Sequence, residues 1–223
     1  MRKRFKARKW IQIAGCALLL TSYQTAMATE TPKYTVLEKQ GEFEVRQYEP
    51  RIVAEVRVDG DLDAASGKGF RVLADYIFGK NQAVINATDS EKRAETSAKI
   101  AMTAPVTVEP LAYKSEMTEA NSWRVEFSMP NHYTQQELPK PLDPNIVIRE
   151  IPATRYASIS YSGMNTESRI NQETSKLLDW VKTNNLKAVG APELARYNPP
   201  WTLPMFRRNE IMIPIKSDEL NRR

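Results

Sequence analysis

Two kinds of hydrophobic spacing divide the chain, one typical of strands and one typical of helices. Apolar residues alternate with other residues over Phe43–Val58, on either side of a bend at Pro50, and again over Ile100–Val108 and Trp123–Met129. Side chains with a period of two share one face of a sheet, so these segments are predicted to be strands.

Helical spacing occurs twice. Phe70, Leu73 and Ile77 recur at steps of three and four before a glycine that acts as a stop signal, and Gly67–Gly69 is interpreted as a turn into this helix. A second amphipathic stripe covers Ile170–Val181. The first helix is apolar on more than one side, so it could face a ligand as well as a core; ordinary core packing of all its residues is the alternative.

The two halves of the chain resemble each other. Val45–Gly60 aligns with Ile148–Gly163 without a gap, and a helix is predicted after each. We therefore predict two β-α-β-β repeats, at about residues 34–135 and 145–215. Each alone would expose an apolar face and unpaired edges, so we expect one distorted antiparallel β-barrel with two flanking helices, in the α+β class. The seam between the halves is a natural place for a ligand cleft.

The first 28 residues have the layout of a secretory signal. Six basic residues precede an apolar run over Trp10–Leu20, and Ala26-Met27-Ala28 follows as a cleavage site. We expect an exported, periplasmic protein whose mature chain, residues 29–223, forms a single domain without a membrane span. The run before Cys16 resembles a bacterial lipobox, so a lipid anchor at Cys16 is the alternative.

Removal of this segment changes the charge and the cysteine count. The chain has 32 basic and 27 acidic residues; six of the basic ones lie in the signal, which leaves 26 against 27. A nearly neutral chain without a basic run gives no support to nucleic-acid binding. Cys16 is the only cysteine, so no disulfide is expected in the mature chain.

The stretch Ala195–Pro214 has the most distinctive chemistry. Its prolines fix φ and exclude a helix, so a stiff connection must present large apolar residues beside two arginines. These residues are Trp201, Met205, Phe206, Arg207 and Arg208. Rings and a thioether offer contact area while guanidinium groups pair carboxylates, a combination that fits a tetrapyrrole. In the alternative, Trp201 and Phe206 plug the end of the barrel and the arginines face water.

Several motifs, in order, resemble the SOUL haem-binding proteins. They are Tyr48-Glu49-Pro50, Gly69-Phe70-Arg71, Tyr76 to Asn81, Lys99 to Val106, Ala195 to Pro204 and Arg207 to Glu210. The resemblance covers about residues 34–215. It implies a distorted barrel of two repeated halves, and non-covalent binding of haem or another porphyrin between the first helix and the loop that joins the last two strands. The resemblance also implies kinship with effector-binding domains, so another amphipathic small molecule is an alternative ligand.

The predicted site joins that helix to that loop. Phe70, Leu73 and Ile77 are expected to pack against one side of the ligand, and loop residues against the other. The loop residues are Trp201, Met205 and Phe206. Basic side chains for the carboxylates of the ligand are expected from Lys68, Arg71, Arg207 and Arg208.

The axial ligand of a haem iron is left open by the sequence. His132 is the only histidine and follows a strand in a turn-like segment, where we expect it to be solvated. No Cys-x-x-Cys-His motif is present for covalent attachment. A zinc-binding helix motif, a serine elbow and a mature cysteine nucleophile are also missing, so a binding protein is favoured. The alternatives are a module for other amphipathic molecules and a tetrapyrrole-processing enzyme.

Overall fold

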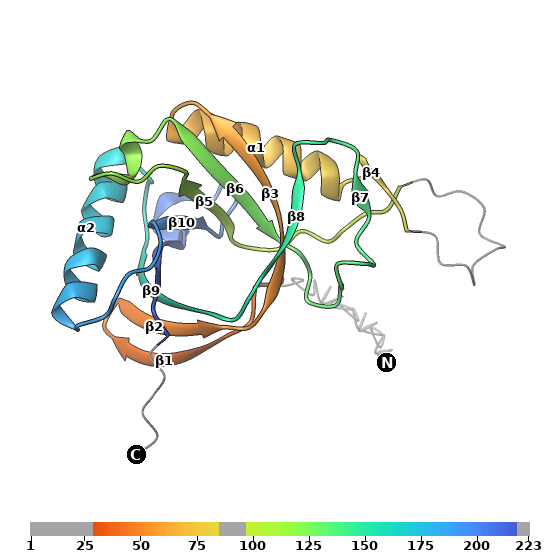
Figure 1. Ribbon diagram of the computed structural model, residues 1–223. Coiled ribbons are helices and arrows are strands. Elements are labelled where there is room, and N and C mark those ends of the chain that lie inside the picture. The colour runs from red at the N-terminus through yellow and green to blue at the C-terminus, as the bar shows by residue number, and fades with distance from the viewer. Residues whose placement is uncertain (1–28, 85–96, 218–223) are drawn as a thin grey trace, which may run out of the picture.

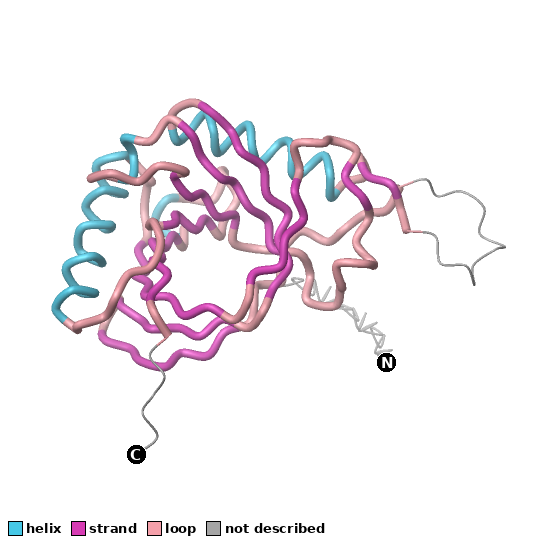
Figure 2. Tube along the Cα trace, in the orientation of Figure 1, coloured by secondary structure: helices cyan, strands magenta, loops and turns pink. Residues whose placement is uncertain are grey.

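A computed structural model describes residues 29–84 and 97–217. The predicted signal segment and Cys16 lie outside these residues. The described chain forms one curled antiparallel sheet with two helices on its outer side (Figure 1). Figure 2 shows the same arrangement, with the strands curling around the middle of the molecule and both helices outside them. No helix in residues 29–84 and 97–217 is long and apolar enough to cross a membrane.

The elements are named in chain order. The first half contributes β1 (Tyr34–Gln40), β2 (Phe43–Tyr48), β3 (Arg51–Asp59), α1 (Leu62–Ile77), β4 (Asn81–Gln82), β5 (Val106–Pro110), the 3-10 helix η1 (Met117–Glu119) and β6 (Ser122–Ser128). The second half contributes β7 (Lys140–Pro141), β8 (Val147–Ile151), β9 (Thr154–Tyr161), α2 (Glu167–Thr183), β10 (Glu193–Arg196), the 3-10 helix η2 (Pro204–Phe206) and β11 (Asn209–Ile215).

The large sheet has nine strands in the order β1-β2-β9-β11-β10-β5-β6-β3-β8, and β4 pairs with β7 separately. The predicted α+β class, with a curled antiparallel sheet and two flanking helices, is confirmed. Strands from the two halves pair crosswise, β2 with β9 and β3 with β8, while β10 and β5 join the halves near the middle. The internal repeat itself stays a prediction.

The strand predicted over Ile100–Val108 is shorter than expected. Only its last residues belong to β5, which begins at Val106. The backbone N–H of Ile100 instead donates to the carbonyl of Ile77 at 2.8 Å, and that of Ala104 donates to the carbonyl of Glu30 at 2.9 Å, so the start of this segment is bound to the end of α1 and to the residues before β1.

Helix α1 begins at Leu62, well before the predicted start. Asp61 caps it by accepting a hydrogen bond from the backbone of the first turn. Gly67 and Gly69 therefore lie inside the helix, and their interpretation as a turn is wrong. A Cβ at Gly69 would be only 2.5 Å from Cγ2 of Val125 on β6, so glycine here allows the helix to approach the sheet closely.

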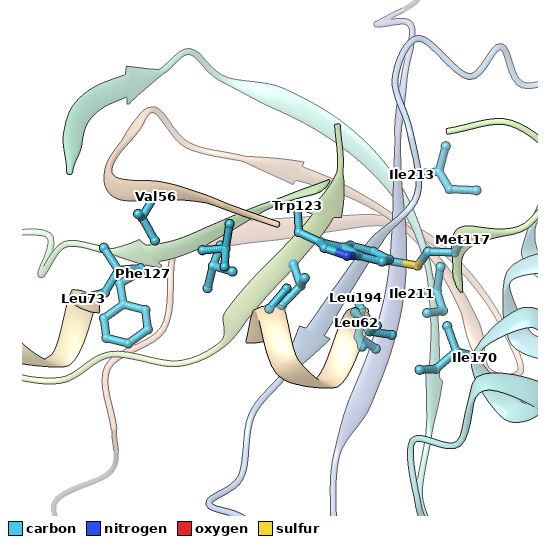
Figure 3. Packing of buried hydrophobic residues seen from close by; sticks show 14 of the residues in the cluster. Val56, Leu62, Leu73, Met117, Trp123, Phe127, Ile170, Leu194, Ile211 and Ile213 are labelled. Atoms are coloured by element: carbon cyan, nitrogen blue, oxygen red, sulfur yellow. The ribbon is translucent and has the colours of Figure 1, made fainter. Parts of the chain in front are cut away.

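The main core lies between the helices and the outer side of the sheet. Trp123 on β6 is fully buried there, and its indole N–H donates to the carbonyl of Gly60 at 3.0 Å. Figure 3 shows the indole ring extending toward Met117, while Leu73 of α1 lies beside Phe127 of β6. This packing holds α1 across β6 and β3, and thereby fixes the orientation of the helix flank that carries Phe70.

Candidate ligand-binding site

Residues 197–208, between β10 and β11, form a loop with a highly exposed apolar surface. Trp201, Leu203, Met205 and Phe206 are 84%, 59%, 65% and 71% exposed. We call these residues 197–208 the apolar loop. Large apolar side chains gathered at a protein surface indicate a binding site. Their exposure also excludes the alternative in which Trp201 and Phe206 plug the end of the barrel.

Arg207 holds the shape of the apolar loop. Its Nε donates to the carbonyl of Thr202 at 2.8 Å, and its Nη2 donates to the carbonyl of Pro200. Its Nη1 lies 3.6 Å from the sulfur of Met164. Arg207 therefore lies beside the exposed apolar residues; its Nε and Nη2 bind carbonyls of the loop itself, and its positive charge is available to a ligand.

A buried carboxylate anchors both ends of the apolar loop. Glu210 accepts hydrogen bonds from Tyr197 Oη at 2.8 Å, Arg208 Nη2 at 2.7 Å and Arg46 Nη1 at 2.7 Å. Burial alone would raise the pKa of Glu210, but the hydrogen bonds and charges of Arg46 and Arg208 outweigh burial and lower this pKa to about 2. Arg208 is therefore committed to Glu210 and is stacked on the Tyr197 ring at 4.0 Å.

The flank of α1 that carries Phe70 faces the apolar loop. Phe70 is 38% exposed, and its ring packs on Phe127 of β6 with a centroid distance of 5.5 Å. In the sheet, Phe127 pairs with Val106, and Val106 pairs with Arg196, the residue before the apolar loop. This row connects Phe70 to the apolar loop: Phe127 is buried beneath Phe70, whereas Val106 and Arg196 are partly exposed and form a floor between Phe70 and the apolar loop.

The other predicted helix residues have different positions. Leu73 and Ile77 are 0% and 1% exposed, because their spacing places them on the stripe that faces the sheet. They support α1 from the core and present no surface to a ligand. Lys68 is two residues before Phe70, roughly 200° around the helix, and so points to the opposite flank. Lys68 and Arg71 are exposed and form no ion pair with any residue that the structure describes.

A polar cleft of about 220 Å³ opens between the first turn of α1 and the base of the apolar loop. Its lining residues are Asp63, Met164, Asn165, Arg196, Asn198, Pro200, Arg207 and Asn209. Sequence reasoning missed Asp63, Met164 and Arg196 as site residues, because they come from three separate elements that no spacing connects. The available signal was the place of Arg196 inside the motif from Ala195 to Pro204.

A larger cleft, of about 310 Å³, lies against the turn that follows β6 and shares no lining residue with the polar cleft. His132 is in that turn and is exposed as expected, with its ring 4.3 Å from that of Tyr133. The lining of this cleft includes two glutamines and a glutamate but none of the exposed residues of the apolar loop, so the larger cleft is separate from the surface formed by that loop. Within the described ranges, no group of three or more His, Cys, Asp or Glu could hold a metal ion.

Residues 29–214 match the SOUL heme-binding protein family. A comparison with curated protein sequences returned no match. Among solved structures, the C-terminal domain of EcmrR is similar at 14% identity and a TM-score of 0.55, with 82% of this chain and 98% of that chain covered. A hydrolase from Listeria innocua is similar at 12% identity and a TM-score of 0.51, with 81% and 94% covered. At these identities the likeness shows the fold alone.

Proposed function

Because the chain belongs to the SOUL heme-binding protein family, we propose that it binds a tetrapyrrole, haem or a metal-free porphyrin, without a covalent bond. The proposed site lies over the partly exposed Val106 and Arg196, between Phe70 and the apolar loop. The observation that carries this proposal is the exposure of four large apolar side chains on a braced loop beside a polar cleft. A flat apolar ring with acidic side arms is complementary to both surfaces.

Burial of the apolar loop beneath a macrocycle provides the driving force. Each large apolar side chain removed from water contributes on the order of 1.5–3 kcal/mol, so a few of them can offset the entropy lost on association. The loop is already held by Arg207 and Glu210, so little further ordering is needed when the ligand binds. The residues of the chain bind and orient the ring; a bound haem supplies its own redox chemistry.

We further propose that the protein buffers or carries tetrapyrroles in an exported compartment. The signal-like segment of residues 1–28 supports this location. A lipid anchor at Cys16 would instead keep the same domain at a membrane surface. The proposed role needs a site that binds and releases its ligand, which is consistent with a surface that binds the ring by apolar contact rather than by a covalent bond.

Titration of haem and of protoporphyrin, followed at the Soret band, tests the proposal. We expect a saturable change at one ligand per chain for both, because the site contacts the ring and not only the metal. Phe206→Asp and Leu203→Asp should each weaken binding by about tenfold or more, since each removes an apolar contact. Leu142→Asp is the matched control: Leu142 is 65% exposed in the turn after β7, away from the apolar loop, and its substitution should leave the affinity unchanged.

Two results would refute this function. One is a Soret change that never saturates. An equal loss of affinity in Leu142→Asp and Leu203→Asp would count against the site in the same way. The other is chemical conversion of the tetrapyrrole without binding of one equivalent, which would favour the enzyme alternative.

A further inference from the structure

The polar cleft is too small for a macrocycle but has the size for an acidic side arm. Its volume of about 220 Å³ is below the range of about 300–1,000 Å³ for pockets that enclose a whole small molecule. Pro200 lines the cleft and is followed directly by Trp201, so the cleft opens at the foot of the apolar loop. A ring that lies on Trp201 can therefore extend a side arm into the cleft.

Arg196 has hydrogen-bonding capacity that the described chain leaves unused. A guanidinium group has five N–H donors in a planar fork. The described residues provide one acceptor, Oδ1 of Asp63, which receives a hydrogen bond from Nη2 at 3.2 Å. The Nε of Arg196 is buried without a partner, which is unfavourable for a polar group. A carboxylate is the acceptor that matches this fork, because its two oxygens can bind two parallel N–H groups.

Asp63 is a partner that a ligand can replace. Its side chain is 82% exposed, whereas that of Arg196 is 27% exposed. Water screens an ion pair of this kind, so the pair holds Asp63 only weakly. A small rotation of the Asp63 side chain toward solvent would leave Arg196 accessible.

The remaining charge of the cleft favours an anion. Arg196 and Arg207 both line it, against the single acidic residue Asp63. Asn198 also lines it; its Oδ1 accepts a hydrogen bond from the backbone N–H of Arg208 at 2.7 Å, and its amide nitrogen has no partner among the described residues. Together these groups provide two positive charges and a neutral donor for one carboxylate.

We propose that the polar cleft is the subsite for a carboxylate of the ligand, that Arg196 binds this carboxylate, and that Asp63 occupies Arg196 until the ligand displaces it. This inference rests on the proposed tetrapyrrole function and specifies which group of the ligand the chain recognises. It assigns the carboxylate to Arg196 in place of the basic residues that the sequence indicated. Recognition then has two parts, the ring on the apolar loop and one acidic arm in the cleft.

The comparison of a porphyrin acid with its ester separates these two parts. Protoporphyrin has free carboxylates, whereas its dimethyl ester has the same ring without them, and binding of each to the full chain is measured by absorbance titration. Arg196→Gln should weaken binding of the acid by about ten- to a hundredfold and leave binding of the ester nearly unchanged. Asp63→Asn should strengthen binding of the acid by a few-fold, because the competing carboxylate is removed, and should not affect the ester.

Lys68→Gln is the matched control. It removes one positive charge from the opposite flank of α1, so it should change the affinity for the acid by less than about twofold, as a distant charge screened by water. Normal binding of the ester by a variant also shows that the variant is folded.

Three results would overturn the inference. The first is an equal loss of acid and ester binding in Arg196→Gln. The second is a loss in Lys68→Gln as large as that in Arg196→Gln, and the third is weaker rather than stronger binding of the acid by Asp63→Asn. Failure of the unchanged protein to bind either acid or ester would instead refute the proposed function itself.

Discussion

The protonation of Glu193 on β10 can be tested through the pH dependence of protein stability. Glu193 is 8% exposed and accepts a hydrogen bond from Tyr156 Oη at 3.1 Å. Burial, together with the nearby carboxylates of Glu126 and Glu109, raises the pKa of Glu193 to about 8. Glu193 is therefore protonated in the folded protein at neutral pH, whereas it is ionised in the unfolded chain.

This difference predicts that stability falls as the pH rises. Between the ordinary value of 4.5 and a folded pKa of about 8, the folded state holds one proton more at Glu193 than the unfolded state. The free energy of unfolding should then fall by about 1.4 kcal/mol per pH unit. Over this interval the loss is up to about 5 kcal/mol, a large share of the roughly 5–15 kcal/mol typical of a folded domain.

Glu193→Gln removes this titration while it keeps an oxygen that accepts the hydrogen bond from Tyr156. We expect similar stabilities near pH 5, where both side chains are neutral in the folded state and the unfolded glutamate has only begun to ionise, and a gain of several kcal/mol for the variant near pH 9, on the order of the loss above. Burial raises the pKa of Glu126 to about 7, so a smaller slope should persist in the variant.

Urea unfolding followed by circular dichroism, at intervals from about pH 5 to about pH 9, measures this difference. Glu38→Gln is the control, because Glu38 is exposed on β1 and its substitution should leave the pH dependence unchanged. Curves for the normal protein and Glu193→Gln that stay parallel over this range would refute the assignment of a raised pKa to Glu193.

Two further substitutions test the packing of α1 and the buried ion pair, both by urea unfolding. Gly69→Ala places a Cβ 2.5 Å from Cγ2 of Val125 and should lower the free energy of unfolding by about 1–3 kcal/mol. Gly67→Ala, whose Cβ would be 3.6 Å from the nearest side chain, should be neutral or stabilise by up to about 1 kcal/mol, and equal effects would contradict the close approach of α1 to the sheet. Glu210→Gln removes one of the two carboxylates that pair with the buried Arg46, since only Glu44, 2.7 Å from Arg46 Nε, remains; the loss should be at the lower end of about 3–5 kcal/mol at neutral pH. This loss should shrink as the pH falls from 4.5 toward 2, because Glu210, whose pKa is lowered to about 2 in the folded protein, contributes its full stability above pH 4.5 and loses it progressively below; a difference independent of pH would contradict this.

Features that act within one segment could be predicted from the sequence. The spacing of apolar residues indicated α2, β6 and the buried stripe of α1, because the face of a side chain depends on residues two, three or four positions away. The prolines between Ala195 and Pro214 likewise indicated a stiff connection, but the sequence left open whether Trp201 and Phe206 are exposed or plug the end of the barrel. The start of α1 was missed, because the reason for a glycine at position 69 lies on another element, at Val125 of β6.

The polar cleft depends on the tertiary structure. Asp63 and Arg196 meet because β10 pairs with β5 while α1 packs across β6, and neither contact can be inferred from local spacing. The partners of the two adjacent arginines also depend on the tertiary structure. Arg207 binds carbonyls of its own loop, and Arg208 binds Glu210. Successive residues of an extended chain point to opposite sides, so two neighbours of the same type face different partners, and only the surrounding strands decide which arginine remains for a ligand.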